Sequence, residues 1–172
     1  MLINLTHDID MLLWLLGDVV EVQAMASSAL RGFDVEDTAA ATLRFSSGAL
    51  GSLIVSDTAV SPWNWDLAAG EAAHYPRQTV EAHYLCGTEG ALTLPGLQVW
   101  RYRGTAGWQN ELTQEHTTVH SADPYAEQLS HLCEVVAGRA MPICSAADGL
   151  RTLRVTRAVL DAAETGQLVR LA

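Results

Sequence analysis

The chain opens with a helical pattern that is apolar on every side, and this pattern limits how the rest can fold. Apolar residues recur at i, i+3, i+4 and i+7, the spacing of a helix with one face on a core: Ile9, Leu12, Leu13 and Leu16. The opposite face is also apolar, with Met11, Trp14 and Leu15. A helix that is apolar all round is buried on all sides. The segment therefore needs a cover, either from later parts of the chain or from a partner.

Polar residues mark both ends of this expected helix. Asp8 and Asp10 suit the positive charge at a helix N-terminus. Gly17 follows the last periodic leucine and is expected to end the helix. The pattern thus predicts a helix from about His7 to Leu16.

Residues 19–120 change to short strand-like runs separated by turn residues. The expected strands are Val19–Ser28, Thr38–Phe45, Ala49–Asp57, Thr79–Leu85, Ala91–Leu94, Leu97–Arg103 and Gln109–His120. Ser46-Ser47-Gly48 predicts a tight hairpin between the second and third of them. Connections this short favour antiparallel pairing.

The last third of the chain carries two helix signatures. Asp123 is an expected N-cap with Pro124 at the first helical position, and this helix should run to Gly138. Ser145 and Asp148 have the spacing of a capping box, which predicts a helix to about Gly166. Its expected inward residues are Leu150, Leu153 and Leu160, and its expected outward residues are Arg151, Arg154 and Arg157. Strands followed by helices predict an α+β fold: a largely antiparallel open β-sheet with helices packed on one face, in a single domain over residues 1–172.

Composition excludes several classes of protein. The 172 residues are 49% hydrophobic and 17% charged, with a formal net charge of −10, so the chain is globular and its surface repels nucleic acid and anionic membranes. All ten basic residues are arginine, which excludes every lysine mechanism within this chain. The three cysteines are widely spaced without a CxxC, so neither a zinc cluster nor a disulfide framework is expected. The absence of a long apolar run or a basic leader favours a cytoplasmic protein.

His7 is the first candidate for chemistry. His7 and Asp10 are i, i+3 neighbours on a helix, so His7 could be a general acid/base that Asp10 orients. The alternative is structural, with the acids as dipole partners and His7 as a satisfied polar group. A metal site would need a third ligand, and none is near in sequence, so no metal is expected.

The second candidate lies in the long segment between Asp57 and Thr79, which has no clear periodicity. Trp63, Asn64 and Trp65 offer aromatic walls and an amide, which suit a sugar or polyol; the alternative is an interface or a packed loop plug. His74 and Tyr75 could add polar contacts there; the alternative is that they form a packed loop corner. No GxGxxG, P-loop or GxSxG occurs, and no βαβ alternation, so no cofactor is expected on this chain alone.

Four stretches, in this order, resemble one known family. They are INLTHDIDMLLWLLGDVVEV, VEDTAAATLRFSSGALGSLIVSDTA, YLCGTEGALTLPGLQVWRY and the closing stretch that runs from Asp123 to Leu171. Together they resemble the C-terminal domain of the glucose-fructose oxidoreductase, inositol dehydrogenase and MocA-type (Gfo/Idh/MocA) oxidoreductases. The resemblance covers nearly the whole chain and implies a two-domain enzyme whose N-terminal Rossmann domain, absent here, binds NAD or NADP. It also implies that this domain holds a small-molecule substrate and forms a homo-oligomer through its sheet face.

Few of the family's site residues have a matching position in this sequence. His7 matches the family's active-site histidine, which transfers a proton or orients substrate. The aspartate that many members carry four positions earlier is Ile3 here, with Asn4 beside it as a possible substrate contact. The Trp63–Trp65 segment falls where the family's substrate-side loop lies.

Three hypotheses follow. The first is the substrate and dimerisation domain of an NAD(P)-dependent oxidoreductase that acts on a sugar, cyclitol or related hydroxyl compound. The second is a stand-alone, non-redox binding or assembly module. The third, on His7, Asp8 and Asp10, is a metal-dependent isomerase or hydrolase.

Overall fold

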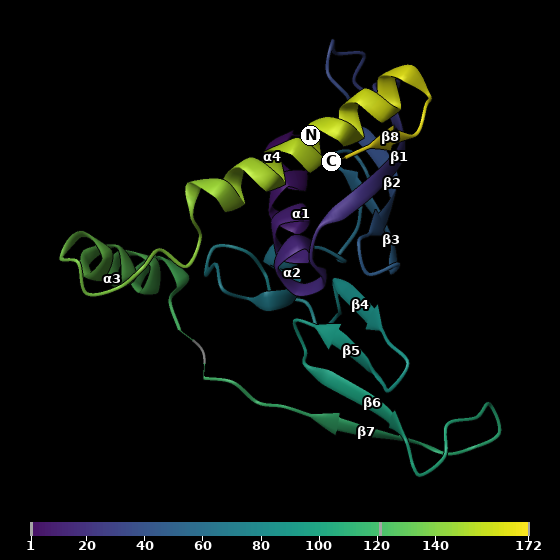
Figure 1. Cartoon of the computed structure of the whole chain (residues 1–172), viewed down its shortest axis with the longest axis vertical. Coiled ribbons are helices and arrows are strands. Elements are labelled where there is room, and N and C mark those ends of the chain that lie inside the picture. Colours follow the sequence, from purple (N-terminus) through teal and green to yellow (C-terminus); the bar gives the residue numbers. More distant parts are fainter. Residues whose placement is uncertain (1, 121, 172) are drawn as a thin grey trace. The chain divides into compact units, whose positions relative to one another are not determined.

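The computed structural model describes residues 2–120 and 122–171, and its elements fall into two compact units. One unit is Met1–Ala59 with Pro142–Ala172, and the other is Val60–Met141. The first unit holds α1 (Leu2–Leu16), β1 (Val19–Ser27), β2 (Thr38–Phe45), β3 (Leu50–Ser56), α4 (Ala146–Thr165) and β8 (Val169–Arg170). The second holds α2 (Trp65–Ala69), β4 (His83–Cys86), β5 (Ala91–Leu94), β6 (Gln98–Tyr102), β7 (Leu112–His116) and α3 (Pro124–Val136) (Figure 1).

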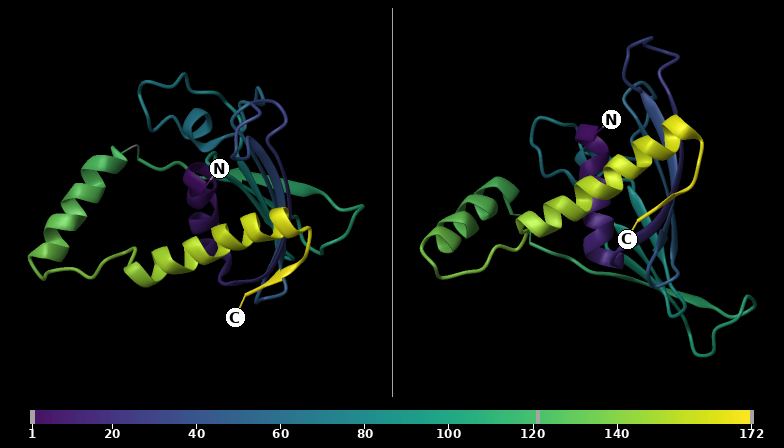
Figure 2. Two further views of the ribbon diagram at one scale, coloured as in Figure 1. Left: turned by 90° about the horizontal axis from the view of Figure 1, so that it is seen from above. Right: turned by 45° about the horizontal axis from the view of Figure 1, so that its top comes forward.

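The sheet of the first unit has the strand order β3-β2-β1-β8, and every neighbouring pair is antiparallel. The hairpin between β2 and β3 closes at Gly48, which has φ of 88° and donates its N–H to the Phe45 carbonyl, as predicted. A bulge interrupts β1 between Val19 and Glu21. α1 and α4 cross one another on one side of this sheet (Figure 2), and the opposite face of the sheet stays open.

α1 begins five residues earlier than predicted, at Leu2, because Leu5 extends the apolar periodicity by one turn. Asp8 and Asp10 consequently lie in the middle of the helix, so the prediction that they sit at its N-terminal end is wrong. Gly17 ends the helix as predicted: its φ is 84° and its N–H bonds the Leu13 carbonyl at 3.0 Å.

Only one side of α1 is buried. Leu5, Ile9 and Leu13 point into a core with strands β1 and β2 and with α4. On the outer side, Ile3 is 81% exposed and Trp14 is 79% exposed. The cover that the sequence predicts for this side is therefore not supplied by the described residues of the first unit.

α4 is capped as predicted but is rotated relative to the prediction. Ser145 and Asp148 bond each other's backbone N–H, and Gly166 ends the helix at φ 68°. The buried face is Thr152, Val155, Thr156, Ala158, Val159 and Ala162. Leu150 and Leu153 are 49% and 55% exposed, so their predicted inward position is wrong. The three outward arginines are confirmed. Small and β-branched side chains let α4 approach the sheet and α1 closely, and the threonine hydroxyls are satisfied by hydrogen bonds.

Asp148 makes the stability of α4 pH-dependent. Its hydrogen bonds with Ser145, and then its contact with Arg151, lower the pKa of its carboxyl from 3.8 to about 2. A pKa depressed in the folded state means that the carboxylate stabilises the protein above pH 3.8, and that this contribution is lost as the pH falls through about 2.

We therefore expect Asp148→Asn to lower the Tm at pH 5 and to lose this effect as the pH approaches 2. The matched control is Asp34→Asn, at an exposed acid between β1 and β2. Thermal melts at half-unit pH steps test this. A Tm difference between wild type and Asp148→Asn that is constant across pH 5 to 2 would contradict the assignment.

The second unit contains the sheet β4-β5-β6-β7, again antiparallel throughout. β5 has its predicted bounds, whereas β4 and β7 are shorter than predicted. Before β4, the Glu81 carboxylate accepts a hydrogen bond from the Gly96 N–H at 2.8 Å, where a longer strand would have made backbone pairs. Before β7, Asn110 bonds the carbonyls of Thr105 and Gly107 and forms a turn.

α3 begins as predicted, since the Asp123 carboxylate accepts the N–H groups of Tyr125 and Ala126. All thirteen residues of α3 are described and none is buried. The α+β class with antiparallel sheets is confirmed, and the single domain over residues 1–172 stays a prediction. Among the described residues, none of the helices has the length and apolarity to cross a membrane.

Candidate functional site

His7 lies on the exposed side of α1, in the N-terminal half of the helix. Asn4, one turn earlier, is also exposed, and so is Ile3. This outer face of α1 (Ile3, Asn4, His7 and Trp14) carries a polar amide and an imidazole between two exposed apolar side chains. The opposite face of the same helix is held in the core, so the direction of His7 is set by a well-packed element.

Asp10 contacts α4. Its Oδ1 accepts the Thr152 hydroxyl hydrogen at 2.6 Å, and Thr152 is only 3% exposed. This contact joins residues 142 positions apart in sequence, which sequence spacing could not indicate. Asp10 is therefore engaged on the inner side of α1, and its role toward His7 or a substrate stays a prediction.

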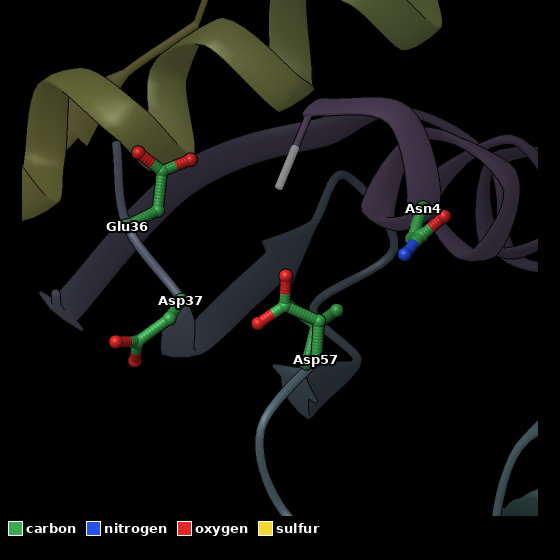
Figure 3. Close-up of a pocket in the computed structure, with 5 residues that line it drawn as sticks. Asn4, Glu36, Asp37 and Asp57 are labelled. Carbon is green, nitrogen blue, oxygen red and sulfur yellow. The ribbon is translucent and has the colours of Figure 1, made fainter. Parts of the chain in front are cut away.

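Asn4 also lines a small cavity of about 20 Å³, together with Glu36, Asp37, Val55 and Asp57 (Figure 3). Asn4 comes from α1, and the acidic residues come from the strand ends across from it. The volume admits about one water molecule. This cavity is too small for a sugar.

Two acidic residues of that cavity, Asp37 and Asp57, hold the loop between β1 and β2. Asp37 Oδ2 accepts the N–H groups of Leu30 and Arg31 at 3.1 Å each. The Arg31 N–H, and to a smaller extent the other hydrogen bonds, lower the pKa of Asp37. The Arg31 guanidinium also pairs with Asp57 at 3.3 Å. These contacts give Asp37 and Asp57 a structural role that sequence analysis missed.

The predicted aperiodic segment in the second unit contains a short helix, α2, that sequence analysis missed. Asn64 is its N-cap, with Oδ1 accepting the Leu67 N–H at 2.9 Å, and Gly70 ends it at φ 69°. The signal was present, because an Asn followed by an Asp in the first turn and a closing Gly are ordinary helix boundaries. The side-chain oxygen of Asn64 is thus engaged in folding this segment.

The two tryptophans of the segment differ in their surroundings. Trp65 donates its indole N–H to Glu71 at 3.0 Å, and its ring lies 6.0 Å from the His83 ring. Trp63 is 66% exposed. Trp63 therefore has the free aromatic surface that a ligand could cover, while Trp65 supports the segment from within.

His74 and Tyr75 lie against each other, with ring centroids 4.2 Å apart and planes inclined by 44°. Tyr75 is 44% exposed. The structure thus places His7, Asn4 and Asp10 on α1 in the first unit, and Trp63, Asn64, Trp65, His74 and Tyr75 in the segment before β4 in the second. Each group is defined within its own unit.

The open face of the first sheet carries a shallow hollow of about 430 Å³ that sequence analysis missed. Glu21 lines this hollow with Arg44, which it bonds at 2.9 Å, and it also bonds Arg170 of β8 at 3.1 Å. These arginines, Arg44 first, lower the pKa of Glu21. The contact depends on the antiparallel register that sets Glu21 beside Arg44 and Arg170. Two arginines against one carboxylate leave this face locally positive on an acidic chain.

Within residues 2–120 and 122–171, no cluster of three or more His, Cys, Asp or Glu side chains could hold a metal ion. Of the two cavities just described, neither is lined by His7. The candidate histidine is thus an open surface group.

The fold places the chain among α+β domains whose helices cover one face of an antiparallel sheet and leave the other face open. The chain belongs to the GFO/IDH/MocA C-terminal domain family, whose model matches residues 1–93. No curated protein sequence is significantly similar to the chain.

Solved structures similar to this chain include dehydrogenases and another oxidoreductase. The chain is similar to levoglucosan dehydrogenase in complex with NADH and levoglucosan, with 21% identity and a TM-score of 0.69 over 97% of this chain and 48% of that one. The chain is 24% identical to the WlbA dehydrogenase from Bordetella pertussis in complex with NADH and UDP-GlcNAcA, with a TM-score of 0.65 over 97% of this chain and 43% of that one. It is 20% identical to an oxidoreductase from Agrobacterium radiobacter in complex with NAD+, L-tartaric acid and magnesium, with a TM-score of 0.63 over 96% of this chain and 47% of that one. The chain spans less than half the length of these proteins, and at such identities the likeness establishes the fold.

Proposed function

We propose that this chain is the substrate-binding half of an NAD- or NADP-dependent oxidoreductase that acts on a hydroxyl group of a sugar, cyclitol or related compound. The observation that carries the proposal is the placement of His7, which stands exposed on the first helix of a domain of this family. The similar structures contain NADH or NAD+ with a sugar, a sugar nucleotide or a hydroxy acid. The nicotinamide cofactor would be held by a second, dinucleotide-binding half outside these residues.

His7 would handle the proton of this reaction. Oxidation of a secondary alcohol removes a hydride from carbon and a proton from oxygen. The nicotinamide, when bound, accepts the hydride. The imidazole of His7 would accept the hydroxyl proton and return it in the reverse direction. Asn4, one turn away on the same exposed side of α1, could donate a hydrogen bond to a neighbouring hydroxyl.

The outer face of α1 is where the second half would cover the reacting atoms. Ile3 and Trp14 are large apolar side chains that stand exposed before and after His7. Burying them would satisfy the apolar pattern of α1 on its second side. It would also exclude water around the imidazole, which strengthens its interactions with substrate.

Trp63 would contact the substrate through its exposed ring, with the His74–Tyr75 pair adding polar contacts. We expect Trp63→Ala, in the complete oxidoreductase, to raise KM about 10-fold. The kcat should change little, because stacking on a part of the substrate that does not react is equal in ground and transition states. Steady-state kinetics with Trp108→Ala as control, a tryptophan that is 101% exposed in another loop, test this. An unchanged KM would remove Trp63 from the substrate site.

The open face of the first sheet supports a homo-oligomer. Met25, Leu50 and Ile54 are 78%, 71% and 80% exposed on this face. They flank the Arg44–Glu21–Arg170 cluster, so a second copy could bury apolar groups around paired charges. A stable dimer would bury about 1,200 Å² or more in total. This contact is also the basis of the alternative function, a stand-alone binding or assembly module.

The oxidoreductase proposal is tested by its absorbance signature. The polypeptide that joins this chain to a dinucleotide-binding half is mixed with NAD or NADP and a panel of sugars, cyclitols and sugar acids. Formation of NADH or NADPH at 340 nm, with at least one of them, is expected. The absence of turnover across the panel, in a protein that binds the cofactor, would favour the assembly module.

A further inference from the structure

We propose that Thr152 of α4 is a positioning residue that sets the direction of His7 through its hydrogen bond to Asp10. The bond fixes the rotation of α1 about its own axis, and His7 is one turn away from Asp10 on that helix. The importance of His7 rests on the function proposed above. The claim about the orientation of α1 rests only on the contact between the two helices.

The contact has the geometry of a strong hydrogen bond. Thr152 Oγ1 lies 2.6 Å from Asp10 Oδ1, which is the distance of a hydroxyl bonded to a carboxylate. The same oxygen lies 3.1 Å from the Asp148 carbonyl one turn earlier in α4, which limits the rotation of the threonine side chain. Thr152 is 3% exposed, so water competes little for this bond.

The core contacts of α1 set which side faces inward, since Leu5, Ile9 and Leu13 are at most 5% exposed. Apolar burial is non-directional. A small rotation of α1 about its axis would change these contacts only gradually, so a directional contact at the edge of the buried face adds precision to the orientation. A hydrogen bond at Asp10 is satisfied in one orientation only, and a partly buried carboxylate without a partner is unfavourable. Single polar contacts within apolar interfaces set register in this way in other helical assemblies.

The direction in which His7 faces follows from the orientation of α1. Successive residues of a helix are about 100° apart, so positions 7 and 10 differ by about 60° around the axis. With Asp10 turned to α4, His7 faces outward, where it is exposed. If α1 rotated about its axis, the imidazole would move with it.

Thr156 supplies a matched comparison on the same helix. It is also β-branched and is 0% exposed. Its hydroxyl donates to the Thr152 carbonyl within α4, at 2.8 Å, and shares a longer hydrogen bond with Thr6 Oγ1 of α1, at 3.5 Å. Thr156→Val therefore removes a buried hydroxyl and its longer bond to Thr6 while leaving the short bond between Thr152 and Asp10 in place.

The test uses the 172-residue chain and the variants Thr152→Val, Thr152→Ser and Thr156→Val. Amide residual dipolar couplings report the orientation of α1 relative to β1 and β2. The rate at which diethyl pyrocarbonate modifies His7, resolved by peptide mass spectrometry, reports its surroundings. We expect Thr152→Val to change the α1 couplings and to change the His7 rate at least about threefold, because the helix samples more than one rotation. Thr152→Ser and Thr156→Val should match the wild type in both.

Two results would overturn the proposal. One is a Thr152→Val chain with wild-type couplings and a wild-type His7 rate but a lower Tm, since the bond would then contribute stability alone. The other is an effect of Thr156→Val equal to that of Thr152→Val. If Thr152→Val does not fold, Asp10→Asn, which keeps the accepting oxygen, and Asp10→Leu, which does not, replace it with the same expectations. None of these measurements uses a cofactor or substrate, so a failed oxidoreductase assay leaves their outcome unaffected.

Discussion

Replacing His7 by alanine is expected to lower kcat at least about 100-fold in the oxidoreductase that contains this chain, because loss of a general acid/base removes that much rate. The chain offers no lysine that could take over the proton. KM should change less than kcat, since the proton moves in the transition state. Steady-state kinetics in both directions, with NAD(P)H absorbance as the signal, measure the effect.

Two variants make the His7 result specific. His7→Gln keeps a hydrogen-bonding group but cannot accept the proton, so it should be as slow as His7→Ala. His116→Ala, at an exposed histidine of β7, should have wild-type kcat. If His7→Ala and His7→Gln both turn over at the wild-type rate, His7 has no part in the chemistry.

Placing a charge on the open sheet face is expected to dissociate the proposed homo-oligomer. Ile54 lies near the middle of β3 and is 80% exposed on that face. Ile54→Glu would bury a carboxylate without a partner in the contact, which should weaken the dimer at least about 30-fold. Sedimentation equilibrium across a range of protein concentrations measures the dissociation constant.

The control for this experiment is Leu30→Glu. Leu30 is 73% exposed in the loop between β1 and β2, so the same change is made away from the strands. It should leave the dissociation constant unchanged. A wild-type chain that is monomeric at the highest concentration, or an Ile54→Glu chain that associates like the wild type, would contradict an interface on this face.

Local signals in the sequence predicted the element boundaries well where a particular residue type is needed. The Ser145–Asp148 capping box, the Asp123–Pro124 helix start and the turn at Gly48 are each visible in a few neighbouring residues. The structure confirms all three. They work because an unsatisfied helix end or a positive φ has few chemical solutions.

Predictions that depended on tertiary packing were less successful. Leu150 and Leu153 were predicted to face inward, but threonine, valine and alanine occupy the buried face of α4 instead. The close approach of α4 to α1 and β1 decides which side of the helix faces inward. Asp10 was placed at a helix end from sequence, and its bond to Thr152 depends on how two distant helices cross. The Glu21 cluster likewise depends on strand register. Propensity and periodicity carry no information about such contacts.

The candidate site was predicted in part. Sequence analysis chose His7 by its pattern and by family resemblance, and the structure places it on an exposed helical face. It also chose Asn64 as a substrate contact, yet the main visible role of that side chain is to cap α2. Neither cavity described above encloses His7, so its role toward a substrate stays a prediction.

The most direct test of the central claim is the DNA sequence upstream of the Met1 codon in the source genome. The account predicts that the reading frame stays open and encodes a dinucleotide-binding half with a GxGxxG turn between a strand and a helix. Kinetic work would then belong on that longer protein. A stop codon directly upstream, with no separate dinucleotide-binding chain encoded beside it, would contradict the oxidoreductase proposal and leave the binding or assembly module in its place.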